Sequence, residues 1–146
     1  IPDCVRAAST GKEIIIRNPH STRPYQHVLE CLSGYLLLAQ KQLEDKSFAG
    51  AYNFGPDDES CVTTGELVSL FCEYWKGSAW KVQGDNGPHE ANFLKLDCSK
   101  SKATLRWNPR WNIRTAVEKV VEFARVASDA ERTACLEKQI REYFAF

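Results

Sequence analysis

The chain has 146 residues, of which 43% are hydrophobic and 26% charged, an ordinary globular composition that excludes a disordered chain. Nineteen basic residues balance nineteen acidic ones, so no net charge favours nucleic acid or an anionic membrane as a partner. The longest strongly apolar run, residues 35–39, is too short to cross a bilayer. We therefore expect residues 1–146 to form a single domain that binds any anion locally.

The first half of the chain is expected to contain two helices and three short strands. Residues 1–10 place their apolar side chains on one helical face, and Gly11 is positioned to end that helix. Residues 30–43 form a longer helix, whose apolar positions are Leu32, Leu36, Ala39 and Leu43. The expected strands are residues 13–17, 26–29 and 51–54, with loops at 18–24 and 46–50.

The second half is expected to be mainly helical, because two capping boxes mark helix starts. Thr63 with Glu66 begins one helix, and Ser128 with Glu131 begins the last one. The last helix is expected to bury an apolar face of Leu136, Ile140 and Tyr143 or Phe144. The remaining expected elements are a strand at 80–83, a loop at 84–89, an extended segment at 93–96, and two helices that follow Asp97 and Asn112.

The fold predicted from these elements is α/β, with short strands and about five or six helices. The strands are too few and too short for a self-sufficient doubly wound sheet, and several would need a partner sheet. The chain also begins at Ile1 and contains no methionine. We therefore expect a processed chain or an excerpt of a longer protein, and we favour the excerpt.

Most catalytic constellations are absent from the sequence. There is no G-x-G-x-x-G or Walker-type loop, no G-x-S-x-G elbow, and no tyrosine followed four residues later by lysine. The three histidines lack the spacing of metal ligands. The six cysteines form no C-x-x-C pair, so we expect reduced, mostly buried thiols in a cytoplasmic protein. No catalytic residue, bound cofactor or metal is therefore expected in this chain.

A proline-stiffened loop with two arginines is the strongest candidate site. Arg17 and Arg23 flank residues 18–22, and a helix follows closely. A rigid loop loses little entropy when it binds, and the planar guanidinium matches phosphate oxygens bidentately. The alternative is that these arginines only pair with an acidic neighbour such as Glu30.

Two weaker candidates follow along the chain. Asn53 ends an expected strand before Gly55, where a ligand can approach the backbone closely, and its amide could donate to a phosphate or a sugar hydroxyl. The alternative is a turn asparagine that bonds its own loop. His89 lies in a loop rich in glycine and proline, and is weak when considered alone.

Taken in order, these segments resemble the extended short-chain dehydrogenase/reductase superfamily. Arg23-Pro24-Tyr25-Gln26-His27-Val28 is similar to its arginine-plus-aromatic motif, and Tyr52-Asn53-Phe54-Gly55 to its strand end. Asp97-Cys98-Ser99-Lys100 and Leu105-Arg106-Trp107-Asn108-Pro109 are similar to its Asp-x-Ser-Lys helix and Leu-Gly-Trp-x-Pro exit, with Arg106 in place of the glycine. Within the superfamily, residues 16–40 are most similar to CDP-glucose 4,6-dehydratases.

The resemblance implies roles for the four candidate residues. Arg23 matches the arginine that contacts the nucleotide pyrophosphate, and the strand that ends at Arg17 matches the segment lining the base. Asn53 matches a polar contact near the phosphates. His89 matches a loop that closes over the nucleotide. These are the expected substrate-binding residues.

The resemblance also implies the activity of a complete protein, a lyase that uses NAD to convert CDP-glucose to CDP-4-keto-6-deoxyglucose. This chain would be its carboxy-terminal substrate-binding part and inactive alone, because the NAD glycine motif and the Tyr-x-x-x-Lys pair are absent. The implied partners are a CDP-sugar, an amino-terminal NAD-binding domain, and further copies of the full-length protein. The alternatives are another nucleotide-sugar epimerase, decarboxylase or reductase, or a stand-alone binding module without enzymatic function.

Overall fold

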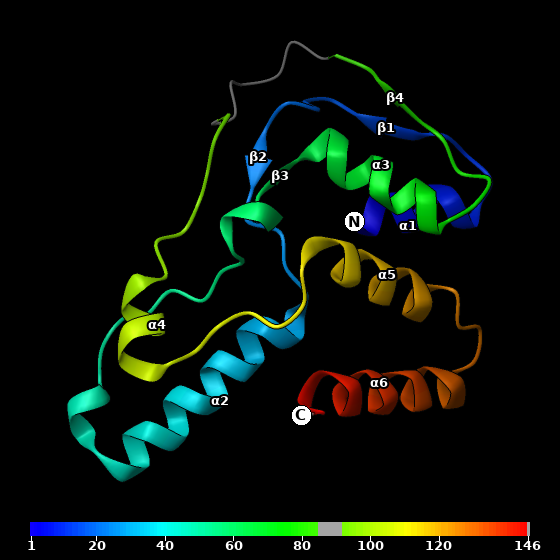
Figure 1. Ribbon diagram of the computed structural model, residues 1–146. Helices are drawn as coiled ribbons and strands as arrows, with labels where there is room; N and C mark the ends of the chain where they lie inside the picture. Colours follow the sequence, from blue (N-terminus) through cyan, green and yellow to red (C-terminus); the bar gives the residue numbers. More distant parts are fainter. Residues whose placement is uncertain (85–91, 146) are drawn as a thin grey trace.

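The computed structural model describes residues 1–84 and 92–145 (Figure 1). These residues contain six α-helices and four short strands, which confirms the expected α/β class. The helices are α1 (Pro2–Ser9), α2 (Val28–Glu44), α3 (Thr64–Tyr74), α4 (Ser99–Leu105), α5 (Ile113–Ala124) and α6 (Asp129–Phe144). The strands are β1 (Ile14–Ile16), β2 (Thr22–Arg23), β3 (Val62–Thr63) and β4 (Trp80–Val82), and two 3-10 turns span Lys46–Phe48 and Asp58–Ser60.

The strands form two separate pairs. β1 runs parallel to β4, with Ile14 opposite Trp80, and β2 runs antiparallel to β3, with Thr22 opposite Thr63. Along β1 the middle residue, Ile15, is exposed while its two neighbours are buried, which is the alternation of a strand covered on one face. Figure 1 shows β1 and β4 beside α3, and α5 beneath α3.

The larger hydrophobic core joins α1, α3, α5 and the β1–β4 pair. Its central helix α3 begins at the predicted capping box: Thr63 Oγ1 accepts from the Glu66 N–H at 3.2 Å, and the Glu66 carboxylate accepts from the Thr63 N–H at 2.8 Å. The buried members are Cys4, Ile14, Ile16, Leu67, Val68, Leu70, Phe71, Val117 and Val121.

A second, smaller core lies against α2. Phe54, Leu105 and Trp107 are buried there, and Leu37 and Leu38 of α2 pack against them. The rings of Phe54 and Trp107 meet edge to face, with centroids 5.1 Å apart. This core joins α2 to α4 and to the segment that follows α4.

The short strand expected at residues 26–29 is wrong. The chain turns directly into α2 there, and His27 is the residue that caps the helix. Its Nδ1 accepts a hydrogen bond from the Leu29 N–H at 3.3 Å. A histidine cap is not among the usual capping residues, so the local sequence pattern did not mark this helix start.

The strand expected at residues 51–54 is also wrong, because this segment pairs with no strand of the described part of the chain. Side chains, rather than a neighbouring strand, bond its backbone carbonyls. The three contacts are Lys100 Nζ to Ala51 O at 3.0 Å, Ser101 Oγ to Asn53 O at 2.7 Å, and Gln26 Nε2 to Phe54 O at 2.8 Å.

The apolar face predicted for α6 is wrong in two of its positions. Leu136 and Ile140 are 47% and 44% exposed. The buried residues of α6 are instead Cys135, Gln139 and Tyr143, of which only Tyr143 was predicted.

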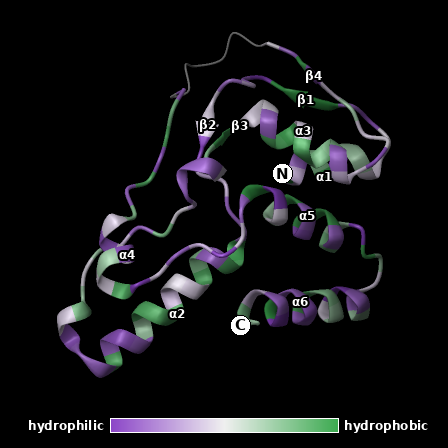
Figure 2. Cartoon of the chain, in the orientation of Figure 1, coloured by the Kyte–Doolittle hydropathy of each residue, from purple (hydrophilic) through white to green (hydrophobic). Residues whose placement is uncertain are grey.

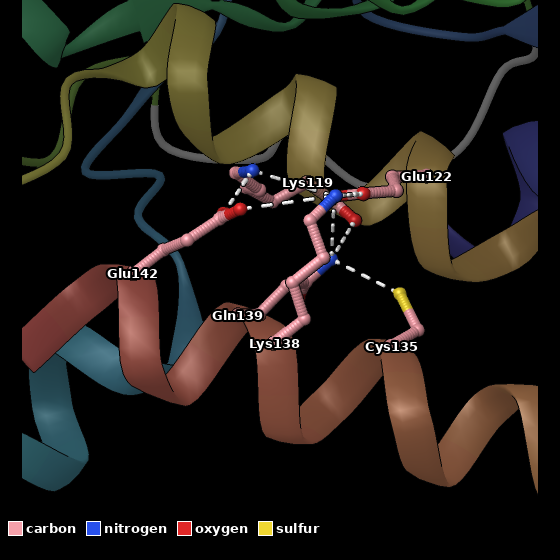
Figure 3. Close-up of polar contacts among 6 residues, drawn as sticks. All are labelled: Lys119, Glu122, Cys135, Lys138, Gln139 and Glu142. Carbon is pink, nitrogen blue, oxygen red and sulfur yellow. Dashed lines mark hydrogen bonds and ion pairs between the residues drawn. The ribbon is translucent and has the colours of Figure 1, made fainter.

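Polar contacts between α5 and α6 account for this orientation (Figure 3). Gln139 Nε2 donates to the Lys119 carbonyl at 2.9 Å and to the Glu122 carboxylate at 3.2 Å. Around it, Lys138 pairs with Glu122 at 2.5 Å, and Lys119 pairs with Glu142. A buried amide requires hydrogen-bond partners, so the polar face of α6 turns inward and the leucine and isoleucine stay outside.

The position where the superfamily motif has glycine adopts the backbone that glycine favours. Arg106 ends α4 with a φ of 56°, in the left-handed region. At the other end of α4 the capping position is Cys98, and Asp97, which precedes it, accepts from the Ser99 N–H at 2.8 Å through Oδ1. Arginine therefore takes the strained conformation itself at the end of α4.

Candidate functional site

The candidate site is centred on the arginine loop, which we define as residues 17–27, between β1 and α2. Arg23 lies in β2 opposite Val62 and is half-buried. Its guanidinium donates to the Thr22 carbonyl at 2.9 Å. Arg17 directly follows β1 and is exposed. Arg23 is thus the more buried of the two arginines.

Hydrogen bonds to the start of α3 hold the arginine loop in place. The hydroxyl of Thr64 lies 2.9 Å from Ser21 Oγ and 3.0 Å from Tyr25 Oη. The N–H groups of Thr64 and Gly65 donate to the carbonyls of Ser21 and Pro19 at 2.9 and 2.8 Å. A loop fixed in this way loses little conformational entropy when a ligand binds.

These bonds also decide how an anion could be held. The amino-terminal N–H groups of a helix are a common phosphate site. In α3 the loop carbonyls use the N–H groups of Thr64 and Gly65, and the Thr63 hydroxyl uses that of Glu66. Phosphate binding at the arginine loop therefore depends on side chains, and above all on guanidinium groups.

Gln26 connects the arginine loop to the segment that carries Asn53. Its Nε2 donates to the Phe54 carbonyl at 2.8 Å. Its Oε1 is buried and has no hydrogen-bond partner among the described residues. Burial without a partner is costly for such an oxygen, so a ligand hydroxyl or N–H group would be well placed to satisfy it.

Asn53 is exposed. Its Nδ2 donates to the Asp97 carbonyl at 3.0 Å, in the segment before α4. This bond spans 44 residues, so it is not the bond within its own loop that was the alternative considered from the sequence. The fold brings Asn53 near the arginine loop through Phe54, and the side chain itself reaches toward the segment before α4.

Residues 92–94, which follow the predicted loop that contains His89, lie against β2 of the arginine loop. Thr22 of β2 donates its N–H to the Asn92 carbonyl at 2.9 Å and accepts at its own carbonyl from the Leu94 N–H at 3.1 Å. Asn92 also accepts from Asn18 Nδ2 at 3.5 Å. His89 lies outside the described residues. The arginine loop therefore contacts residues 92–94 through Thr22 of β2 and residues 51–54 through Gln26.

Three lysines contact residues 51–58, and the sequence analysis did not name them as candidate site residues. Lys95 pairs with Asp58 at 2.9 Å and lowers the pKa of that exposed carboxyl group. Lys102 pairs with Asp57, and Lys100 lies 4.3 Å from the centre of the Tyr52 ring. The stretch around Lys100 that resembles the superfamily was the only sequence signal for these lysines. The spacing of the three lysines matches no phosphate-binding motif.

The acid proposed as an alternative partner for the arginines is engaged elsewhere. Glu30 is fully buried, and its carboxylate accepts from the Trp111 N–H at 2.8 Å, from the Arg110 N–H at 3.1 Å and from Tyr143 Oη at 2.7 Å. Burial raises the pKa of Tyr143, which keeps its hydroxyl protonated as a donor. Glu30 therefore joins α2 to α6.

The described part of the chain contains no group of three or more histidine, cysteine, aspartate or glutamate side chains that could hold a metal ion. None of its helices is long and apolar enough to cross a membrane. All six cysteines lie in this part of the chain as free thiols, and Cys4, Cys98 and Cys135 are buried.

Solved structures define the class of the fold. The fold is similar to that of UDP-N-acetylglucosamine 4-epimerase from Bacillus cereus, with a TM-score of 0.63 and 20% identity over 84% of this chain and 42% of that one. It is also similar to RMD from Pseudomonas aeruginosa, solved with NADPH, with a TM-score of 0.65 and 13% identity over 83% and 39%. The chain thus has the extended, Rossmann-type fold found in the matching part of these two structures, as predicted.

In sequence, the chain is homologous to the carboxy-terminal part of CDP-glucose 4,6-dehydratase from Salmonella typhimurium. The two are 40% identical over 148 aligned positions, which cover 99% of this chain and 41% of the Salmonella protein. The chain thus spans about two fifths of the length of this relative. No protein-family model matches the chain. The resemblance drawn from the motifs is confirmed.

Proposed function

We propose that this chain is the sugar-nucleotide-binding portion of a 4,6-dehydratase and that its substrate is CDP-glucose. The observation that carries this proposal is the 40% identity to the Salmonella enzyme over almost the whole chain. The arginine loop supports it independently, because this fixed loop carries both a half-buried guanidinium and a buried acceptor that has no partner among the described residues. The two groups suit a ligand with both phosphates and hydroxyls.

In this proposal Arg23 binds the pyrophosphate, and the strand that ends at Arg17 lines the nucleotide base. Asn53 contributes a polar contact through the segment that Gln26 ties to the arginine loop. His89 belongs to a loop that covers the nucleotide. The orientation of Arg23 toward the Thr22 carbonyl supports a defined role for its guanidinium.

The residues present do not fit a dinucleotide. The sequence has no glycine-rich turn that opens a helix, and the N–H groups at the start of α3 are used by the arginine loop. We therefore propose that NAD and the redox residues belong to an amino-terminal part of a longer enzyme, and that this chain alone is inactive. We also propose that the full-length enzyme is cytoplasmic and homo-oligomeric. The free thiols support the cytoplasmic location.

Calorimetric titration of the chain with CDP-, UDP-, GDP- and dTDP-glucose tests the proposal. We expect CDP-glucose to bind most tightly. Arg23→Ala should weaken its binding by about 1.5–3 kcal/mol, because a charge-assisted hydrogen bond is lost. The matched control is Arg132→Ala on α6, an exposed arginine that pairs with Asp129. Equal affinities of the two variants would remove the phosphate role of Arg23, and preference for a uridine nucleotide would indicate an epimerase-like enzyme instead.

A further inference from the structure

Helix α2 is apolar on two opposite sides. Its inner side packs into the smaller core through Leu37, Leu38 and Gly34. Gly34 is buried, and a Cβ atom added there would overlap the ring of Phe54, so the helix and this ring are in close contact. The inner side is therefore a fully formed packing surface.

The other side of α2 carries a row of exposed apolar residues, which we call the outer stripe. Their spacing of three, four or seven residues puts them on one face of the helix. With their exposed fractions, they are Val28 (61%), Leu32 (44%), Tyr35 (56%), Leu36 (65%) and Leu43 (90%), with the exposed Ala39 among them. Figure 2 shows hydrophobic positions recurring along α2.

A helix that is apolar on all sides is characteristic of a position buried between two layers. Single exposed leucines are ordinary on a protein surface, whereas a contiguous apolar patch marks an interaction site. The stripe is continued by a hollow of about 550 Å³ that Leu36 lines together with Phe144 at the end of α6. The lining of this hollow is mixed, because Gln40, Arg106 and Arg110 also contribute to it.

The unpaired segment 51–54 lies next to this surface. The ring of Phe54 meets that of Tyr35, a member of the outer stripe, edge to face with centroids 5.6 Å apart. The segment follows α2 in the chain, as a strand follows its helix in an α/β unit, and its residues have the pattern of a strand. Such a strand normally pairs with a parallel neighbour, and the described residues provide none.

We propose that the outer stripe and residues 51–54 together form the docking surface for the amino-terminal part of a dehydratase. The partner covers the stripe with an apolar face. It also offers a strand edge to residues 51–54, where a strand would replace side-chain contacts to the backbone carbonyls such as those of Lys100 and Ser101. This inference rests on the proposed function. It is supported by the fraction of the Salmonella enzyme that the chain spans, 41%, which leaves a larger part of such an enzyme to cover the surface.

A capture experiment tests this assignment. The chain is co-expressed with a tagged amino-terminal part of the Salmonella dehydratase, comprising the residues that precede the matched portion and giving a folded circular-dichroism spectrum. The variant Leu32→Glu/Leu36→Glu places charges on the outer stripe. The matched control Leu136→Glu/Ile140→Glu changes two α6 residues of similar exposure, 47% and 44%.

We expect the tagged part to capture the unmodified chain and the α6 control equally, and to capture the outer-stripe variant at least tenfold less. Equal capture of both variants, or no capture of the unmodified chain, would overturn the assignment. Sedimentation of the chain alone provides a second measurement. A dimer that Leu32→Glu/Leu36→Glu abolishes would assign the stripe to a second copy and also overturn the proposal.

The capture requires no nucleotide, so its outcome is distinguishable from that of the proposed function. Capture without CDP-glucose binding would support the docking surface and count against the substrate. Binding of CDP-glucose without capture would do the reverse.

Discussion

At the scale of single residues, His27 shows how burial sets the state of a side chain. It is 8% exposed, and its ring meets that of Trp111 with centroids 5.0 Å apart. Burial lowers the pKa of His27, and the positive charge of Lys119 lowers it further. The neutral ring can accept the Leu29 N–H at Nδ1, whereas the protonated ring cannot.

The lowered pKa predicts a pH dependence of stability. The unfolded chain binds a proton at His27 more readily than the folded chain does. The free energy of unfolding is therefore highest above the unfolded pKa of about 6.5, and it decreases as the pH falls below that value. In urea unfolding at pH 7.5 and pH 5, His27→Asn should reduce this decrease, since asparagine retains the cap without titrating. His20→Asn, at an exposed histidine, should leave the decrease as it is in the unmodified chain. An equal reduction in both variants would contradict the assignment to His27.

At the scale of elements, one tyrosine joins the first long helix to the last. Tyr143 of α6 is 1% exposed and donates to the Glu30 carboxylate at 2.7 Å. Its hydroxyl also lies 2.9 Å from Ser33 Oγ on α2, which accepts from Trp107 Nε1 at 3.1 Å. These contacts join residues that are 74 to 113 positions apart in the sequence, so local patterns give no indication of them.

Tyr143→Phe should lower the free energy of unfolding by about 1.5–3 kcal/mol, because the buried Glu30 carboxylate loses a hydrogen-bond donor. Urea denaturation followed by circular dichroism measures this change. The control is Tyr35→Phe on the exposed stripe of α2, for which we expect a change within about 0.5 kcal/mol. If both variants were equally stable, Glu30 would not be the polar link between α2 and α6.

Sequence patterns predicted those elements whose causes are local. Both capping boxes form at the predicted residues, Thr63 with Glu66 and Ser128 with Glu131, because each needs only neighbours three residues apart. The strand at residues 51–54 and the inward face of α6 were predicted incorrectly, because both depend on distant partners. Gln139 illustrates the difference, since its polar amide is buried only through contacts with α5.

The candidate site, like the fold, was predicted only where its causes are local in the sequence. Proline and arginine spacing indicated the arginine loop, and in the structure this loop contacts residues 92–94 through Thr22 and residues 51–54 through Gln26. The sequence could not predict that Gln26 Oε1 is buried without a hydrogen-bond partner among the described residues, because this depends on how Phe54 packs against the loop.

At the scale of the whole molecule, two properties support the proposal that the chain is part of a larger enzyme. Its homology covers 99% of its own length and 41% of the Salmonella dehydratase. Its helix α2 leaves an apolar face exposed beside an unpaired strand-like segment. The arginine loop, in contrast, is complete in its internal bonds, so we expect it to keep its structure and some affinity for the ligand in the isolated chain.

The central claim is that a sugar nucleotide binds at the arginine loop. A two-dimensional ¹H–¹⁵N NMR titration of the chain with CDP-glucose tests it most directly, with glucose 1-phosphate as the matched ligand that lacks cytidine. We predict that CDP-glucose shifts the amides of residues 17–27 and 51–56 at lower concentration than glucose 1-phosphate does, and that the amides of α5 and α6 stay in place. Absence of shifts in the arginine loop, or shifts confined to α5 and α6, would contradict the claim.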